Sequence, residues 1–383
     1  MPEISDLSRS LALQTAEAQI RSAAPFEAET LACFEAKRPV WGGSAITVFA
    51  PSYQMLGEDH QINDLRRERA AAHLAAAGVS VLFEANVYRQ AGRYAGSDAE
   101  RAEGLMAALE HPDADLALAL RGGYGASRVL PLLDWKRIER TTVPMAGYSD
   151  VTALSLAFLA KLGRASWQAP MMGDLSEAHA DMPYTVGRFG ALLGEAIEPV
   201  DFRTADLPLD PGEAGSAVLS ASALLGRAGG SREAWGCEGL IWGGNLCLAE
   251  SLLGTPYFPK IEGGILYLED VGEAAYRVER MLLSLLDAGV LPKQKAILIG
   301  DFRDADRAWR FAGDHSLARA LLTVREGLDR AGAAVPIVTG LPFGHIPRKA
   351  SLPVGVAGTL ELHPLENDWQ ASLAWGGCQR KGA

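Results

Sequence analysis

The segment Leu116–Gly125 (LALALRGGYG) decides the fold class of this protein. Its first half is an apolar run, which predicts a buried strand, and its second half is a glycine-rich loop where that strand ends. Residues 143–150 (VPMAGYSD) repeat this design, because an apolar run again leads into a glycine and a polar turn. In parallel α/β sheets, loops at the carboxyl ends of the strands form the ligand crevice. We therefore expect both loops to line a functional site.

Helical and extended patterns alternate on the amino-terminal side of this segment. Residues 45–50 and 79–83 are short apolar runs that predict strands, and residues 64–77 form a helical pattern that ends at Gly78. Residues 97–100 (SDAE) have the spacing of a capping box at the start of another helix. This alternation predicts a parallel sheet covered by helices.

The remainder of the chain predicts a second α/β part. Residues 240–242, 264–268, 296–299 and 335–339 are strand candidates, and an apolar stripe over residues 278–286 predicts an amphipathic helix.

We expect an α/β protein with four parts. Residues 1–40 predict a peripheral helical extension, and residues 41–189 an N-terminal domain with a parallel sheet. Residues 190–234 are rich in Pro, Gly, Ser and Ala and predict an interdomain connection. Residues 235–383 would then form a C-terminal mixed α/β domain.

The composition excludes several classes of function. The 383 residues include 36 Lys and Arg against 47 Asp and Glu, and this net charge of −11 disfavours binding to a nucleic-acid backbone. The four cysteines are scattered, so we expect no metal site, no disulfide framework and a reducing compartment. Without a Gly-x-Gly-x-x-Gly or Gly-Lys-Ser/Thr motif, we expect no nucleotide cofactor.

The amino terminus lacks a signal-peptide pattern, and no apolar run approaches the roughly 18 residues of a membrane span. We therefore expect a cytoplasmic protein that does not bind membranes.

Three side chains are candidates for hydrolytic chemistry. Ser149 follows a predicted strand and precedes a helix, where it could be a nucleophile or only cap the helix. His345 lies in a turn-rich segment after the last predicted strand and is the candidate base among seven histidines, but it could also be a loop histidine that only bonds to the backbone. Glu269 ends an apolar strand and could orient that histidine, with Asp270 and Glu273 as rivals.

Seven short stretches together resemble the LD-carboxypeptidase family of serine peptidases, which includes muramoyl-tetrapeptide carboxypeptidases and microcin C immunity peptidases. They occur in the family's order over about residues 44–360: Ala50-Pro51-Ser52, Tyr94–Asp98 with Arg101, Arg121–Gly125, Gly147–Thr152, Gly243–Leu246, Leu268–Asp270 with Arg280, and Gly344-His345. The chain departs from the family at Gln168-Ala169-Pro170, where many members have a His-Gly-Pro-like stretch.

The resemblance implies a catalytic triad of Ser149, Glu269 and His345. It also implies an oxyanion hole made by the backbone N–H groups of Gly123 and Asp150. In this family the active site lies between an N-terminal and a C-terminal domain, the protein is a homodimer, and the reaction needs no cofactor or metal.

The implied reaction is removal of a C-terminal D-amino acid, D-Ala, from a small murein tetrapeptide during peptidoglycan recycling. Two alternatives remain open. One is hydrolysis of an aminoacyl-nucleotide conjugate, as in the immunity peptidases, for which Trp235 or Trp242 could stack on the base. The other is a non-catalytic peptide-binding relative.

Overall fold

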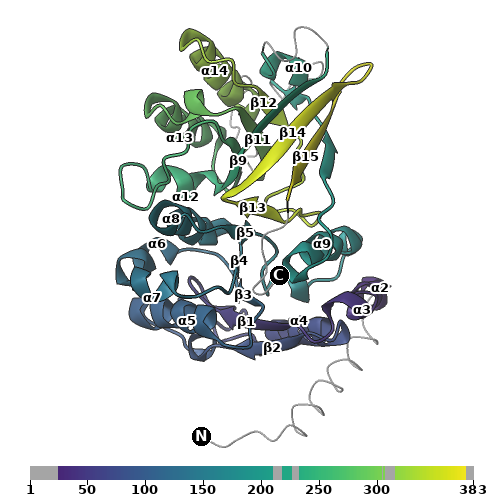
Figure 1. Ribbon diagram of the computed structural model, residues 1–383, viewed down its shortest axis with the longest axis vertical. Helices are drawn as coiled ribbons and strands as arrows, with labels where there is room; N and C mark the ends of the chain where they lie inside the picture. The colour runs from purple at the N-terminus through teal and green to yellow at the C-terminus, as the bar shows by residue number, and fades with distance from the viewer. Residues whose placement is uncertain (1–24, 210–217, 227–232, 304, 307–314, 377–383) are drawn as a thin grey trace, which may run out of the picture. The chain divides into compact units, whose positions relative to one another are not determined.

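A computed structural model describes residues 25–209, 218–226, 233–303, 305–306 and 315–376 (Figure 1). The described residues form two compact units. The first unit contains those up to Val151 together with Ala169–Ala196, and the second contains Thr152–Gln168 and those from Ile197 onward. Residues 1–24 of the expected N-terminal extension lie outside the described residues.

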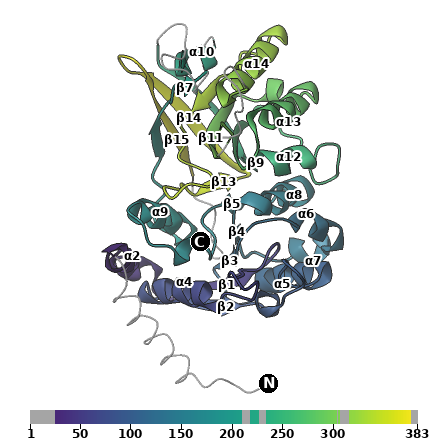
Figure 2. The same ribbon diagram turned by 180° about the vertical axis from the view of Figure 1, so that it is seen from behind.

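The first unit is built on a parallel sheet with the strand order β2-β1-β3-β4. Its strands are β1 (Ala45–Phe49), β2 (Ser80–Phe83), β3 (Leu116–Ala119) and β4 (Met145–Ala146). Its helices are α2 (Pro25–Glu35), α3 (Arg38–Trp41), α4 (Asp64–Ala76), α5 (Asp98–Glu110), α6 (Ala126–Val129), α7 (Trp135–Glu139) and α9 (Met182–Phe189). Helix α5 lies on one face of the sheet and α4 on the other (Figures 1 and 2).

Local signals in the sequence explain why these helices begin and end where they do. Helix α5 starts with the predicted capping box, in which the Ser97 side chain accepts from the Glu100 N–H and Glu100 accepts from the Ser97 N–H. Helix α4 is followed by Gly78 with φ +75°, a left-handed conformation that glycine adopts at little cost. The expected parallel α/β sheet is therefore confirmed.

One buried histidine in the first unit is expected to make the free energy of unfolding depend on pH. His73 on α4 is fully buried, stacks on Phe34 of α2, and donates from Nδ1 to the Leu175 carbonyl at 2.7 Å. Its Nε2 has no hydrogen-bond partner among the described residues. Burial lowers the pKa of His73 from its usual value of 6.5, because a charged imidazolium would lose its hydration there.

We expect the free energy of unfolding to fall as the pH drops below about 6.5, by up to ~1.4 kcal/mol per pH unit from this group. Below that pH the unfolded chain binds a proton that the folded chain does not. His73→Gln keeps a donor for Leu175 and should flatten this dependence. Urea unfolding of both proteins at pH 7.5 and 5.5 tests the prediction, and equal losses in both would contradict it.

The second unit contains a seven-stranded mixed sheet with the order β12-β11-β10-β9-β14-β15-β6. Strands β9 to β12 run parallel, whereas β14, β15 and β6 join antiparallel. The bounds are β6 (Val200–Arg203), β9 (Trp235–Asn245), β10 (Ile265–Val271), β11 (Ala296–Arg303), β12 (Ile337–Thr339), β14 (Val356–Pro364) and β15 (Trp369–Trp375). All four predicted strands of this half are present.

The other elements of the second unit are two short strand pairs and five helices. Strand β5 (Ser166–Gln168) pairs antiparallel with β13 (Leu352–Val354), and β7 (Leu207–Pro208) with β8 (Val218–Leu219). The helices are α8 (Thr152–Leu162), α10 (Ala221–Leu224), α12 (Leu246–Ser251), α13 (Ala275–Asp287) and α14 (Leu317–Arg330). Helices α12, α13 and α14 lie on one face of the seven-stranded sheet (Figures 1 and 2).

The segment expected to be an interdomain connection contains a strand. Within residues 190–234, β6 pairs with β15, and its Val200 and Phe202 are buried while the residues between and after them are exposed. This alternation is a strand pattern, which the high content of proline and glycine around it obscures. The sheet therefore extends into that segment.

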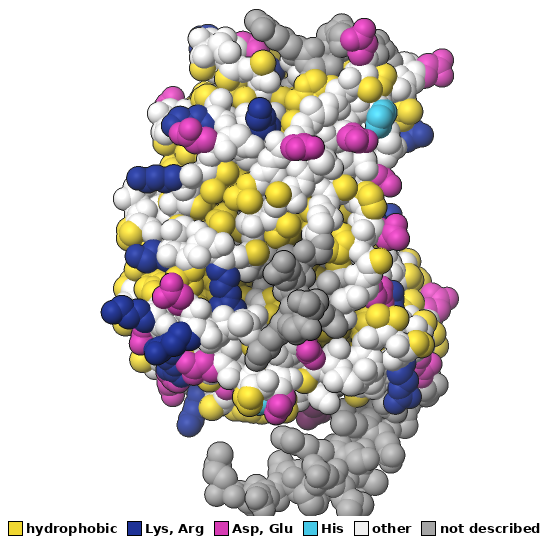
Figure 3. Space-filling view, in the orientation of Figure 1, with side chains coloured by type: hydrophobic (Ala, Val, Ile, Leu, Met, Phe, Trp, Pro, Cys, Tyr) yellow, Lys and Arg dark blue, Asp and Glu magenta, His cyan; other side chains and the backbone are white. Residues whose placement is uncertain are grey.

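Two surface features bear on possible partners. On the face in Figure 3, Lys and Arg side chains are most frequent toward the lower left, where some acidic side chains lie among them. No helix among the described residues combines the length and the hydropathy that a membrane span requires.

Candidate active site

Ser149 has an unusual backbone conformation directly after β4. It begins the short 3-10 helix Ser149–Val151, with φ +61°, and among the described residues the one other non-glycine position with positive φ is His60. This conformation costs a serine roughly 1–3 kcal/mol, and residues held in this way concentrate at functional sites. The observation favours a nucleophile over a simple helix cap.

The glycine loop after β3 packs directly against Ser149. A Cβ added to Gly122 would lie 2.9 Å from Ser149 Cβ, 3.0 Å from its Oγ and 3.4 Å from the Asp150 backbone nitrogen. Gly123 has φ +123°, and a Cβ there would collide with the ring of Tyr53. Because β1, β3 and β4 are parallel neighbours, their carboxyl-terminal loops meet at one edge of the sheet.

The side chain of Asp150 ties these loops together. Its Oδ2 accepts a hydrogen bond from Ser52 Oγ at 2.5 Å and another from the Ala126 N–H at 2.8 Å. Burial raises the pKa of Asp150, whereas these two hydrogen bonds and the charge of Arg101 act in the opposite direction. The Asp150 carboxylate thus holds the loops in place. The backbone N–H of Asp150 is the group that remains a candidate for the oxyanion hole.

Arg101 fixes the same loops from the side of α5. This fully buried side chain donates from Nη1 to the carbonyl oxygens of Pro51 at 2.5 Å and Gly125 at 2.9 Å, and it forms an ion pair with Asp98. The loops after β1 and β3 are therefore held by a charged side chain whose own charge is compensated.

Glu269 and His345 form a hydrogen-bonded pair in the second unit. Glu269 lies on β10, is fully buried, and accepts from His345 Nδ1 through Oε2 at 2.8 Å. The His345 side chain, which follows β12, is 19% exposed. Because Nδ1 donates to the carboxylate, Nε2 is the ring nitrogen that can accept a proton. This arrangement is the one that a general base and its orienting carboxylate require.

The two rival carboxylates make other contacts. Asp270 accepts from the backbone N–H groups of Cys247 at 2.9 Å and Val271 at 2.7 Å, and burial, with the nearby charge of Glu269, raises its pKa to about 7. Glu273 forms an ion pair with Arg277 at 3.6 Å. Of the three candidates, only Glu269 contacts His345.

Asn245 also binds Glu269, and it was not singled out as a site residue in the sequence analysis. Its Nδ2 donates to Glu269 Oε1 at 3.2 Å, and its backbone N–H donates to Thr152 Oγ1 at 3.0 Å. Thr152 in turn donates to Gln168 Oε1 at 3.2 Å, and Gln168 Nε2 donates to Ser155 Oγ at 3.0 Å. The position of Asn245 at the carboxyl end of β9, beside β10, is the signal that could have identified it.

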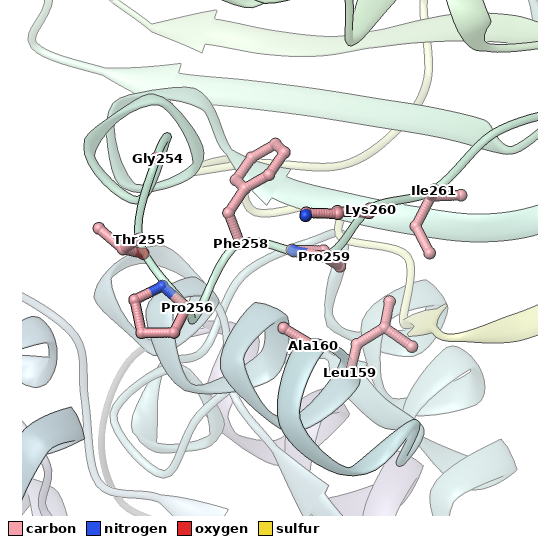
Figure 4. Close-up of a pocket in the computed structure, with 9 residues that line it drawn as sticks. All are labelled: Leu159, Ala160, Gly254, Thr255, Pro256, Phe258, Pro259, Lys260 and Ile261. Atoms are coloured by element: carbon pink, nitrogen blue, oxygen red, sulfur yellow. The ribbon is translucent and has the colours of Figure 1, made fainter.

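The second unit also contains a pocket that none of the candidate residues lines. It has a volume of about 790 Å³ and lies between α8 and the loop 254–261, as Figure 4 shows. Trp242 is not available for stacking on a substrate, because it is buried, packs against Phe258 and donates to Gln294 Oε1 at 3.0 Å.

Comparisons of the sequence identify related proteins. The LD-carboxypeptidase N-terminal domain model matches residues 46–169 and the LD-carboxypeptidase C-terminal domain model matches residues 238–360. A putative carboxypeptidase of Streptomyces coelicolor is 33% identical over 269 residues, which are 70% of this chain and 75% of that protein. The murein tetrapeptide carboxypeptidase of Pseudomonas aeruginosa is 32% identical over 272 residues, 70% of this chain and 79% of that protein.

Solved structures share the fold. The muramoyltetrapeptide carboxypeptidase of Oxalobacter formigenes has a TM-score of 0.64 and 30% identity, and the match covers 86% of this chain and 99% of that one. The microcin C7 self-immunity protein MccF has a TM-score of 0.68 at 21% identity, over 88% of this chain and 97% of that one. The chain therefore belongs to the LD-carboxypeptidase family and is a serine-type carboxypeptidase.

Proposed function

We propose that this protein is a cytoplasmic, homodimeric LD-carboxypeptidase that removes the C-terminal D-Ala from murein tetrapeptides during peptidoglycan recycling. The catalytic groups are Ser149, His345 and Glu269. The observation that carries the proposal is the hydrogen bond from His345 Nδ1 to the buried Glu269 carboxylate, which leaves Nε2 as a base. The similarity to a murein tetrapeptide carboxypeptidase supports the choice of substrate.

In the proposed mechanism, His345 Nε2 takes the proton of Ser149 Oγ while the oxygen attacks the scissile carbonyl carbon. The backbone N–H groups of Gly123 and Asp150 stabilise the resulting oxyanion, and Glu269 stabilises the imidazolium. His345 then protonates the amine of D-Ala, which leaves. Water, deprotonated by His345, hydrolyses the acyl-enzyme and regenerates the serine.

Mass spectrometry of murein tetrapeptide incubated with the purified protein tests this function. The expected products are the tripeptide and free D-Ala, and an intact tetrapeptide would contradict the proposal. A parallel incubation with an aminoacyl-sulfamoyl adenosine distinguishes the immunity-type reaction, because that activity would cleave the conjugate and leave the tetrapeptide unchanged.

Gly122→Ala is expected to lower kcat on the tetrapeptide by about 10²-fold, because the new Cβ must displace either Ser149 or the glycine loop. The matched control is Gly187→Ala on α9 in the same unit, where a Cβ meets nothing within 4 Å. Steady-state kinetics and thermal unfolding of both variants check the prediction. An unchanged kcat in a folded Gly122→Ala protein would show that the two loops are not closely coupled.

A further inference from the structure

A second pocket lies in the first unit, next to the loop that packs on Ser149. Its volume is about 430 Å³, which is within the range of small-molecule binding pockets. The lining residues include two arginines and a histidine but no carboxylate: Tyr53, Gln54, Leu56, Gly57, His60, Arg93 and Arg121. The pocket is therefore positively charged, in a protein whose net charge is −11.

Arg121 is the half-buried cation of this pocket and the residue immediately before Gly122. Among the described residues, its one hydrogen bond runs from Nη1 to the Gln54 carbonyl oxygen at 3.3 Å, and it forms no ion pair. A guanidinium has five N–H donors, so most of the N–H groups of Arg121 can still donate to a ligand. Burial lowers the pKa of Arg121, and the neighbouring positive charges of Arg66 and Arg93 act in the same direction.

Two nearby arginines in this unit have their charge compensated. Arg66 binds Glu177 at 3.1 Å and the Gly173 carbonyl oxygen at 3.2 Å, and buried Arg101 is paired with Asp98. Arg93 resembles Arg121 in lacking a described ion pair, and its guanidinium lies 4.6 Å from the centre of the Tyr53 ring. Arg93 is exposed to solvent, whereas Arg121 is half-buried without a described acidic partner, and a half-buried arginine beside a cavity that has no carboxylate indicates an anionic ligand.

The pocket adjoins the groups proposed for catalysis. Tyr53, one of its walls, occupies the space beside Gly123, and the hydroxyl-bearing rings of Tyr53 and Tyr148 lie close enough to interact electrostatically with Arg121. Tyr148 directly precedes Ser149. In a C-terminal residue, only the amide nitrogen and Cα separate the scissile carbonyl carbon from the terminal carboxylate. When Ser149 attacks the scissile carbonyl, the terminal carboxylate therefore lies only a few bonds away. Arg121, which precedes Gly122, can reach a carboxylate at that distance.

We propose that this pocket, defined by Arg121 and Arg93, binds the C-terminal carboxylate of the peptide substrate and so restricts the enzyme to terminal residues. Arg121 forms the principal contact and Arg93 adds a second positive charge. The proposal rests on the proposed peptidase function. A peptide amide or an internal residue leaves the guanidinium without its anion, and such a mismatch is strongly rejected.

The test compares murein tetrapeptide with the same peptide carrying a C-terminal amide. We expect Arg121→Gln to lower kcat/KM for the free acid by about 10²-fold or more, chiefly through KM, and to change hydrolysis of the amide little. Arg121→Lys should restore part of the preference for the acid. Arg66→Gln is the matched control, because Arg66 lies near Arg121 but is already paired with Glu177. An unchanged ratio of acid to amide in Arg121→Gln overturns the proposal.

Binding to an inactive enzyme separates this proposal from the proposed reaction. Calorimetry with Ser149→Ala should show tighter binding of the acid than of the amide, and the double variant Ser149→Ala/Arg121→Gln should lose that difference. If the native enzyme cleaves neither peptide but this preference is present, the reaction is wrong and the pocket assignment stands. Equal affinity of Ser149→Ala for both peptides overturns the pocket assignment, whatever the activity.

Discussion

Ser149→Ala is expected to slow D-Ala release from murein tetrapeptide by about 10⁴-fold or more, because removal of a serine nucleophile disables every member of a triad at once. The residual rate would come from binding and from the backbone N–H groups of Gly123 and Asp150, which the substitution leaves in place. The measurement is the rate of D-Ala formation, followed by mass spectrometry under single-turnover and steady-state conditions.

Ser127→Ala provides the control for this experiment. Ser127 lies on α6 in the same unit and takes part in none of the hydrogen bonds described for the site. It should therefore retain the native rate. Turnover of Ser149→Ala near the native rate would rule out a serine mechanism at this position, and with it the roles given to His345 and Glu269.

Local sequence patterns were sufficient to predict the elements that hold Ser149. The apolar runs of β1 and β3 and the capping box of α5 each depend on residues that are close in sequence, and all three elements are present. The positive φ of Ser149 was not predictable in this way. It belongs to a tightly packed contact with Gly122, whose place in the chain is 27 positions earlier.

Long-range polar contacts were the part that the sequence did not reveal. Asn245 binds Glu269 only because β9 and β10 are adjacent and in register at their carboxyl ends. Gln168, noticed as a departure from the family pattern, is a buried partner of Thr152 and Ser155. That Arg121 has no acidic partner among the described residues likewise depends on which carboxylates the fold brings near, and no local pattern encodes that.

Replacing each of the carboxylates of Glu269, Asp270 and Glu273 with the corresponding amide separates the roles of these three candidates. Glu269→Gln is expected to lower kcat by about 10³- to 10⁴-fold with little change in KM. The amide cannot stabilise an imidazolium by charge, and an amide NH₂ facing His345 would require Nδ1 to accept, which places the proton on Nε2 and blocks it as a base. Progress curves at several substrate concentrations give kcat and KM separately.

Asp270→Asn and Glu273→Gln are the matched controls, since both remove a carboxylate within four residues of Glu269. Glu273 forms an ion pair with Arg277, and Asp270 accepts hydrogen bonds from two backbone N–H groups. Neither carboxylate contacts His345. Asp270→Asn removes a buried group whose pKa is raised to about 7, and it should change stability more than turnover. A kcat for Glu269→Gln that is no lower than that of these two variants would mean that the buried Glu269–His345 hydrogen bond has only a structural role. If kcat falls strongly only in Glu269→Gln, Glu269 is the carboxylate that orients His345. The two controls remove a carboxylate close to Glu269 in the sequence, but neither of those carboxylates contacts His345.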